Sequence, residues 1–318
     1  MSTGAGRRTP ERRRRGATLT SPRLRPPLEA GRLLAGRYRL ERPLGRRGVV
    51  WLARSGDDDD GGGGGWGGGG DSGSGSGSGS GDSDSGRLWA VKTGPAVLLE
   101  QEHRILSRIA HPAIVRLRDF CDSEAGPILV LEYLAGGDLV GLAGGAPSRW
   151  LDPVLALIGA LDCLHAAGLV HRDLKARNVM LDGGDRARLI DFGSALPIGS
   201  AWTSAGTTAA AVAPDRGAEP VAPADDVYAL AALLHELIHG RPPGPWQPAA
   251  GRTAPVLSPS RSTANAPALA AAPTPANAPT ALAALVDAGL GGRQMAARIG
   301  LAGFRTVIES QCQHFQRF

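Results

Sequence analysis

Short runs of apolar residues, several of them alternating with polar ones, mark the first part of the chain. This pattern is typical of β-strands. A helix is predicted from Ala96 to Ala110, where apolar side chains recur at helical spacing. Together these features predict a mainly β region that contains one helix. The predicted strands cover residues 38–40, 49–53, 88–92, 114–117 and 128–131.

In the second part of the chain, apolar residues recur at the longer spacing that is typical of helices. Residues 151–167 are rich in Leu and Ala, and residues 226–239 form a second apolar stretch that Gly240 to Pro243 ends. Residues 281–308 are predicted to be helical again. The order of elements indicates an α+β fold, with a mainly β part followed by a mainly helical part.

Four segments lack these patterns. Residues 1–35 include four consecutive arginines, and we expect a disordered basic arm. Residues 56–87 are almost entirely Gly, Ser and Asp, and residues 245–280 are rich in Pro, Ala, Ser and Thr, so both are expected to lack stable structure. Residues 311–318 are assigned to a tail. The remaining parts, 36–133 and 134–310, are interpreted as the two lobes of the fold.

The cysteine content and the distribution of apolar residues indicate the cellular compartment. Three widely spaced cysteines are an odd number, which argues against a disulfide framework and favours a reducing, cytoplasmic location. The first thirty residues lack the apolar core of a signal peptide, and no apolar run reaches the ~20 residues of a membrane span. The basic arm has no aromatic residues among its charges, so no nucleic-acid site is predicted.

Candidate chemistry is concentrated in residues 170–178 and 189–193. The first stretch contains Asp173, Lys175 and Asn178. A carboxylate can accept a proton from a hydroxyl, an ammonium can neutralise a phosphoryl group, and an amide oxygen is a ligand that Mg²⁺ accepts. The second stretch is an apolar strand that ends in Asp191, which provides another carboxylate.

These two stretches resemble the catalytic loop and the metal-binding turn of the eukaryotic-like Ser/Thr protein kinases. The resemblance covers roughly residues 37–243. It implies a two-lobed fold with ATP in the cleft between the lobes. It also implies that Asp173 is the catalytic base, that Lys175 stabilises the transferred phosphate, and that Asn178 and Asp191 bind Mg²⁺.

The same resemblance assigns an ATP site. The chain contains only two lysines, Lys92 and Lys175, and both stand where the kinase pattern requires lysine. Lys92 would contact the α- and β-phosphates, and Glu102, chosen by counting back from the His111-Pro112 pair, would orient it. The other residues assigned to ATP form the glycine-rich turn, the adenine pocket and the hinge: Gly45, Gly48, Val50, Ala90, Leu131, Glu132 and Leu134.

Two features depart from the kinase pattern. The turn around Gly45 and Gly48 is about two residues short. Asp215 occupies the position of a glutamate, and its partner is expected to be Arg293 or Arg298.

The implied function is transfer of the γ-phosphoryl group of ATP to serine or threonine hydroxyls of proteins, including those of the chain's own segment after Asp191. Lys175, two residues after Asp173, favours serine and threonine over tyrosine. Two alternatives remain open at this point. One is a pseudokinase that binds nucleotide or a partner without transferring phosphate, and the other is a small-molecule kinase of related fold.

Overall fold

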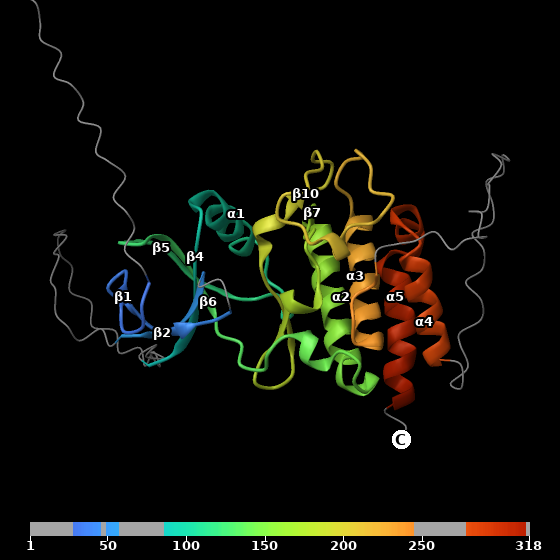
Figure 1. The fold of residues 1–318 in the computed structure, drawn as a ribbon, viewed down its shortest axis with the longest axis horizontal. Coiled ribbons are helices and arrows are strands. Elements are labelled where there is room, and N and C mark those ends of the chain that lie inside the picture. The colour runs from blue at the N-terminus through green and yellow to red at the C-terminus, as the bar shows by residue number, and fades with distance from the viewer. Residues whose placement is uncertain (1–27, 46–48, 57–85, 245–277, 316–318) are drawn as a thin grey trace, which may run out of the picture.

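A computed structural model of the chain describes residues 28–45, 49–56, 86–244 and 278–315 (Figure 1). Several predictions concern residues outside these ranges. They include most of the basic arm, Gly48, nearly all of the Gly/Ser/Asp-rich segment and most of the Pro/Ala-rich segment.

A six-stranded antiparallel sheet forms the first part of the fold. Its strand order is β1-β2-β3-β4-β6-β5. In β2 and β4, buried and more exposed side chains alternate, so one face of the sheet packs inward. The strands are β1 (Leu33–Leu34), β2 (Tyr38–Pro43), β3 (Val50–Ser55), β4 (Leu88–Thr93), β5 (Leu117–Ser123) and β6 (Gly126–Glu132).

Two strand predictions need correction. Leu33–Leu34, expected within the disordered arm, pairs with β2, and Leu34 is fully buried in the core of the sheet. The strand predicted at 114–117 begins only at Leu117. Ile114 and Val115 instead lie beside Leu189, and the Val115 N–H donates to its carbonyl oxygen at 3.0 Å. Their apolar side chains are therefore buried without joining the sheet.

The helix α1 (Ala96–Leu106) lies between the sheet and the helical part of the molecule, as Figure 1 shows. It ends earlier than the predicted boundary at Ala110. Its buried residues include Leu99, Ile105 and Leu106, which belong to the larger of two core clusters. That cluster continues through Leu129 and Leu131 of β6 into the helices, so a shared apolar core connects the two parts.

Four longer helices pack side by side in the second part (Figure 1). They are α2 (Leu151–Ala166), α3 (Pro223–His239), α4 (Ala278–Gly289) and α5 (Arg293–Phe315). Among the described residues, no helix is both long and apolar enough to cross a membrane.

The helical stretch predicted at 281–308 is two helices rather than one. Leu290 to Gly292 separate α4 from α5, and α5 itself changes direction at Gly300 (φ 61°, ψ 177°). α5 also extends beyond residue 310, where the tail was expected to begin. Gln311 and Cys312 are buried there, so packing continues the helix to Phe315.

Short elements hold the loops that carry the candidate site. The strand pairs are β7 (Leu169–Val170) with β10 (Leu196–Pro197), and β8 (Val179–Leu181) with β9 (Ala187–Leu189). The single-turn 3₁₀ helices are η1 (Leu139–Leu142), η2 (Pro147–Arg149), η3 (Ala176–Asn178), η4 (Phe192–Ser194) and η5 (Ala209–Ala211). As a result, the turn after β9 lies next to the loop before β8.

Candidate active site

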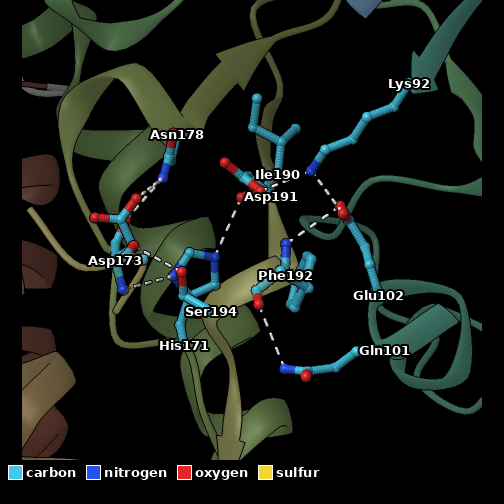
Figure 2. Close-up of polar contacts among 12 residues, drawn as sticks. Lys92, Gln101, Glu102, His171, Asp173, Asn178, Ile190, Asp191, Phe192 and Ser194 are labelled. Carbon is cyan, nitrogen blue, oxygen red and sulfur yellow. Dashed lines mark hydrogen bonds and ion pairs between the residues drawn. The ribbon is translucent and has the colours of Figure 1, made fainter. Parts of the chain in front are cut away.

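Lys92 connects the sheet to the helical part. It extends from β4, and its Nζ lies 2.6 Å from Glu102 Oε2 on α1 and 2.7 Å from Asp191 Oδ1 after β9 (Figure 2). The Glu102 side chain is only 1% exposed, whereas that of Asp191 is 46% exposed. Because Glu102 is buried, its ion pair with Lys92 must have good geometry to offset the cost of desolvation. Both contacts of the Lys92 ammonium are short enough to meet this requirement.

Electrostatic interactions keep the side chains of Lys92 and Asp191 charged. Burial opposes the charged form of Lys92, but the Glu102 and Asp191 carboxylates outweigh it and raise the pKa of the lysine. Burial also opposes ionisation of Asp191, yet the Lys92 ammonium lowers the pKa of that carboxyl. The site therefore presents a protonated ammonium and an ionised carboxylate near neutral pH.

The turn after β9 is fixed against α1. Asp191 has a left-handed backbone (φ 66°, ψ 72°), and Phe192 is fully buried. The Phe192 N–H donates to Glu102 Oε1 at 3.2 Å, and Gln101 Nε2 donates to the Ala195 carbonyl oxygen at 2.6 Å. Sequence reasoning did not identify Gln101, because an amide on a helix surface has no motif of its own.

Asp173 lies in the loop before η3 and accepts hydrogen bonds on both carboxylate oxygens. Lys175 Nζ lies 2.5 Å from Oδ2, and Asn178 Nδ2 donates to the same oxygen at 3.0 Å. The backbone N–H of Thr208 donates to Oδ1 at 2.8 Å. The carboxylate is thus held in one orientation, which a general base requires.

Thr208 is a site residue that the sequence analysis missed. Lys175 Nζ donates to its Oγ1 at 2.8 Å, so this threonine contacts both Lys175 and Asp173. By its resemblance to a kinase activation segment, the sequence instead points to Gly206 and Thr207 as the residues near the substrate. The Thr207 hydroxyl instead donates to the Ser204 carbonyl oxygen at 2.9 Å.

Asp226 supports the loop from α3. Its carboxylate is fully buried and accepts the backbone N–H groups of His171 and Arg172, each at 2.9 Å. His165 Nε2 lies 2.9 Å from the same carboxylate. Burial opposes ionisation of Asp226, but these hydrogen bonds and the nearby His165 lower its pKa. The loop backbone therefore rests on an ionised, satisfied carboxylate.

The residues assigned to the glycine-rich turn and the adenine pocket lie on strands β3, β4 and β6 or, for Gly45, in the turn after β2. Gly45 follows β2 with φ 92°, a conformation that favours glycine. Val50 is paired with Lys92 across β3 and β4, and Ala90 is paired with Leu131 across β4 and β6. The sheet register thus places Val50 beside Lys92 and Ala90 beside Leu131.

The hinge residues begin at Glu132, the last residue of β6. The Glu132 carboxylate accepts the Arg116 N–H at 2.9 Å and Arg188 Nε at 3.2 Å, so this side chain is already engaged. Leu134 is buried, and no backbone hydrogen bond among the described residues uses its N–H.

The donor set suits magnesium. Asn178 donates through Nδ2 to Asp173, which turns its amide oxygen to the other side. Asp191 contributes a half-exposed carboxylate. Mg²⁺ is commonly held by one or two such oxygen ligands together with substrate phosphates. The residues present thus fit the ion.

Asp215 has a different kind of partner from the one predicted. Its Oδ1 accepts the backbone N–H of Arg293, the first residue of α5, at 2.7 Å. The Arg293 guanidinium bonds instead to Asp225 Oδ1 at 2.9 Å and to the Pro220 carbonyl oxygen at 2.7 Å. The shorter aspartate therefore binds a helix N-terminus rather than a guanidinium.

Two hollows lie away from these residues. They have volumes of about 460 and 440 Å³ and run along α2 and the turn between β8 and β9. They share Asp152, Pro153, Asp185 and Arg186 in their linings, and neither is lined by Lys92 or Asp173.

Comparison with known proteins agrees with this geometry. Residues 80–299 match the protein kinase domain, and the chain belongs to the protein kinase family. It is 30% identical over 240 residues to a probable serine/threonine-protein kinase of Streptomyces coelicolor, covering 68% of this chain and 32% of that protein.

Two kinases of Mycobacterium tuberculosis are also similar. PknB is 32% identical over 158 residues, covering 45% of this chain and 25% of its own length. PknH is 32% identical over 154 residues, covering 46% of this chain and 25% of its own length. The chain spans a third or less of the length of these relatives.

Proposed function

We propose that the protein transfers the γ-phosphoryl group of ATP to serine and threonine hydroxyls of proteins. The observation that supports this best is the convergence of two charged groups. One is the Lys92–Asp191 ion pair, and the other is the Asp173–Lys175 pair. The Ile190 N–H donates to the Asn178 carbonyl oxygen at 2.9 Å, and Asn178 Nδ2 donates to Asp173, so the turn that carries Asp191 lies beside the loop that carries Asp173.

Each residue then has a role that its contacts support. Asp173, held on both oxygens, orients the acceptor hydroxyl and takes its proton. Lys175 offsets negative charge on the transferring phosphoryl group. Lys92, oriented by Glu102, binds the other phosphates of ATP.

The adenine is proposed to lie by the hinge. Leu134 offers its unused backbone N–H there, and the pocket is lined by Val50, Ala90 and Leu131. The carboxylate of Glu132 is occupied by arginines, so only the backbone of that residue is assigned to the nucleotide.

Asn178 and Asp191 are proposed to hold magnesium. When bound, Mg²⁺ neutralises charge on the phosphate oxygens and aligns them for transfer. Asp191 is suited to this because it is ionised and half exposed, and its other contact is the phosphate-binding Lys92.

We further propose that residues 36–133 and 134–310 act as the two lobes. Cys121, Cys163 and Cys312 are free thiols in the described chain, which supports a reducing, cytoplasmic setting for the protein.

A phosphotransfer assay tests the proposal. Purified protein is incubated with γ-labelled ATP and Mg²⁺, alone, with Ser/Thr-containing proteins, and with a panel of aminoglycoside-like compounds. Label on serine and threonine is the expected result. Label on the small molecules alone would identify a small-molecule kinase, and nucleotide binding without any transfer would identify a pseudokinase.

A further inference from the structure

The indole ring of Trp202 contacts two buried arginines. The guanidinium carbons of Arg172 and Arg216 are 4.7 and 4.1 Å from the centre of its indole ring. Arg172 is 3% exposed, and the Arg216 side chain is 2% exposed. Stacking of a desolvated cation on a tryptophan face is among the stronger cation–π contacts.

The two guanidiniums are incompletely satisfied by other groups. Arg172 Nε and Arg216 Nη2 are buried without a hydrogen-bond acceptor in the part of the chain that the structure describes. Asp225 lies 3.0 Å from Arg216 Nε and offsets part of the charge. Two adjacent buried cations repel each other, and the negative face of the indole lowers that cost.

This stack is connected to the catalytic loop. Arg172 directly precedes Asp173, and its Nη1 donates to the Ser194 carbonyl oxygen at 3.0 Å. Its Nη2 donates to the carbonyl oxygen of Thr203, the residue after Trp202. One guanidinium thus binds the indole, the segment that follows it and the turn after Asp191.

The same segment closes at two further points. Ser194 Oγ donates to the Gly206 carbonyl oxygen at 2.7 Å. Gly206 has φ 77°, and a Cβ there would lie 2.4 Å from that hydroxyl. Two residues later, Thr208 contacts Asp173 and Lys175. The path from the Trp202 stack to the candidate base is therefore short and made of defined contacts.

We propose that Trp202 is a positioning residue that holds residues 199–208 against the catalytic loop without any phosphate group on that segment. Two neighbouring guanidiniums could bind an anion such as a phosphate group. In this chain both guanidiniums contact the π-system of the Trp202 indole instead. The expected effect on catalysis rests on the proposed kinase function. The ordering of residues 199–208 by Trp202 does not depend on that function.

Amide hydrogen exchange of the full, phosphatase-treated chain without nucleotide tests the ordering. The Thr208 N–H, which is bonded to Asp173, reports it. In Trp202→Ala this amide is expected to exchange about tenfold faster than in the wild type, whereas Trp202→Phe restores most of the protection. Ser200→Ala, on the same segment, is the matched control and exchanges like the wild type.

Trp202→Leu separates stacking from bulk, and it serves if the alanine variant does not fold. It keeps an apolar side chain but has no π-face, so faster exchange at Thr208 is expected. Wild-type protection in Trp202→Leu, or in a folded Trp202→Ala, would overturn the proposal. Protection of the wild type only after Thr203 or Ser204 is phosphorylated would overturn it as well.

Steady-state kinetics then tests the consequence. Trp202→Ala is expected to lower kcat/KM for a protein substrate about tenfold while the KM for ATP stays unchanged. A wild-type protein that transfers no phosphate but protects Thr208 would contradict the kinase proposal and leave the positioning role of Trp202 intact.

Discussion

The ammonium of Lys92 lies 2.7 Å from the carboxylate of Asp191, a residue 99 positions further along the chain. The contact joins β4 of the sheet to the turn after β9. The chain's other lysine, Lys175, is paired in the same way with Asp173 at 2.5 Å. Both lysines are therefore placed by carboxylates of the candidate site, in a chain that otherwise uses arginine for its cationic side chains.

Replacing Lys92 by arginine is expected to impair nucleotide use. The ammonium is a compact charge between two carboxylates, and a planar guanidinium cannot reproduce both contacts. Turnover is expected to fall by about tenfold or more. Steady-state assays with varied ATP measure it. Arg54→Lys, in the exposed pair with Glu41 on the same sheet, is the control, and an equal effect of both variants would refute the specific role of Lys92.

Thr208→Val is expected to lower kcat by about tenfold. The substitution keeps the shape and the backbone N–H but removes the oxygen that accepts from Lys175, a hydrogen bond to a charged group. Thr208→Ser keeps the hydroxyl and should retain most activity. Comparison of kcat for the two variants provides the check, and equal activity would show that the Lys175–Thr208 contact is dispensable.

Gly292→Ala is expected to destabilise the fold by about 1–3 kcal/mol. Gly292 has φ 115°, and an added Cβ would lie 2.6–2.8 Å from the Asp215 carboxylate that binds the start of α5. Denaturant unfolding measures the change. The matched control is Gly141→Ala, where a Cβ would meet open space. Unchanged stability of Gly292→Ala would mean that the Asp215 contact is absent or adaptable.

Asp226→Asn is expected to reduce stability at pH 7 by about 3 kcal/mol, because a charged acceptor of several hydrogen bonds is lost. The folded pKa of Asp226 lies below its ordinary value. Its contribution is therefore fully present above about pH 4 and is lost as pH falls through the folded pKa.

The difference between wild type and Asp226→Asn should consequently shrink only in strong acid. Chemical denaturation from pH 7 to pH 2 measures it. Asp162→Asn, at an exposed site, should change stability by less than about 0.5 kcal/mol throughout. A wild-type advantage that grew on acidification would contradict the assignment of an ionised Asp226.

The sequence was most informative where residue type and chain order fix the chemistry. The kinase pattern and the scarcity of lysine located Lys92 at the end of a predicted strand. A register count on a predicted helix located Glu102, and the loop motif located Asp173. The structure brings Lys92 together with Glu102, and Asp173 together with Lys175 and Asn178. Local patterns sufficed there because each side chain lies on a regular element or in a short motif.

Other features depend on tertiary contacts that no local pattern encodes. Thr208 was missed because the resemblance pointed to its neighbour Thr207, whereas the contacts with Asp173 and Lys175 are made by Thr208. The Trp202 stack needs Arg216, which lies 14 residues further along the chain. Mostly irregular backbone separates the two residues, so no periodic pattern predicts their contact. Asp215 was expected to find a guanidinium, but its short side chain reaches a backbone N–H instead. In each case the side-chain geometry, rather than the residue type, decides the partner.

The most direct test of the account compares Asp173→Asn with the wild type in two measurements on the same preparations. Nucleotide affinity, measured by titration with Mg²⁺ and ATP, should be nearly unchanged. Transfer of label from γ-labelled ATP to serine and threonine should fall by about 100-fold or more, because the general base is lost. Transfer by Asp173→Asn at the wild-type rate would contradict the central claim.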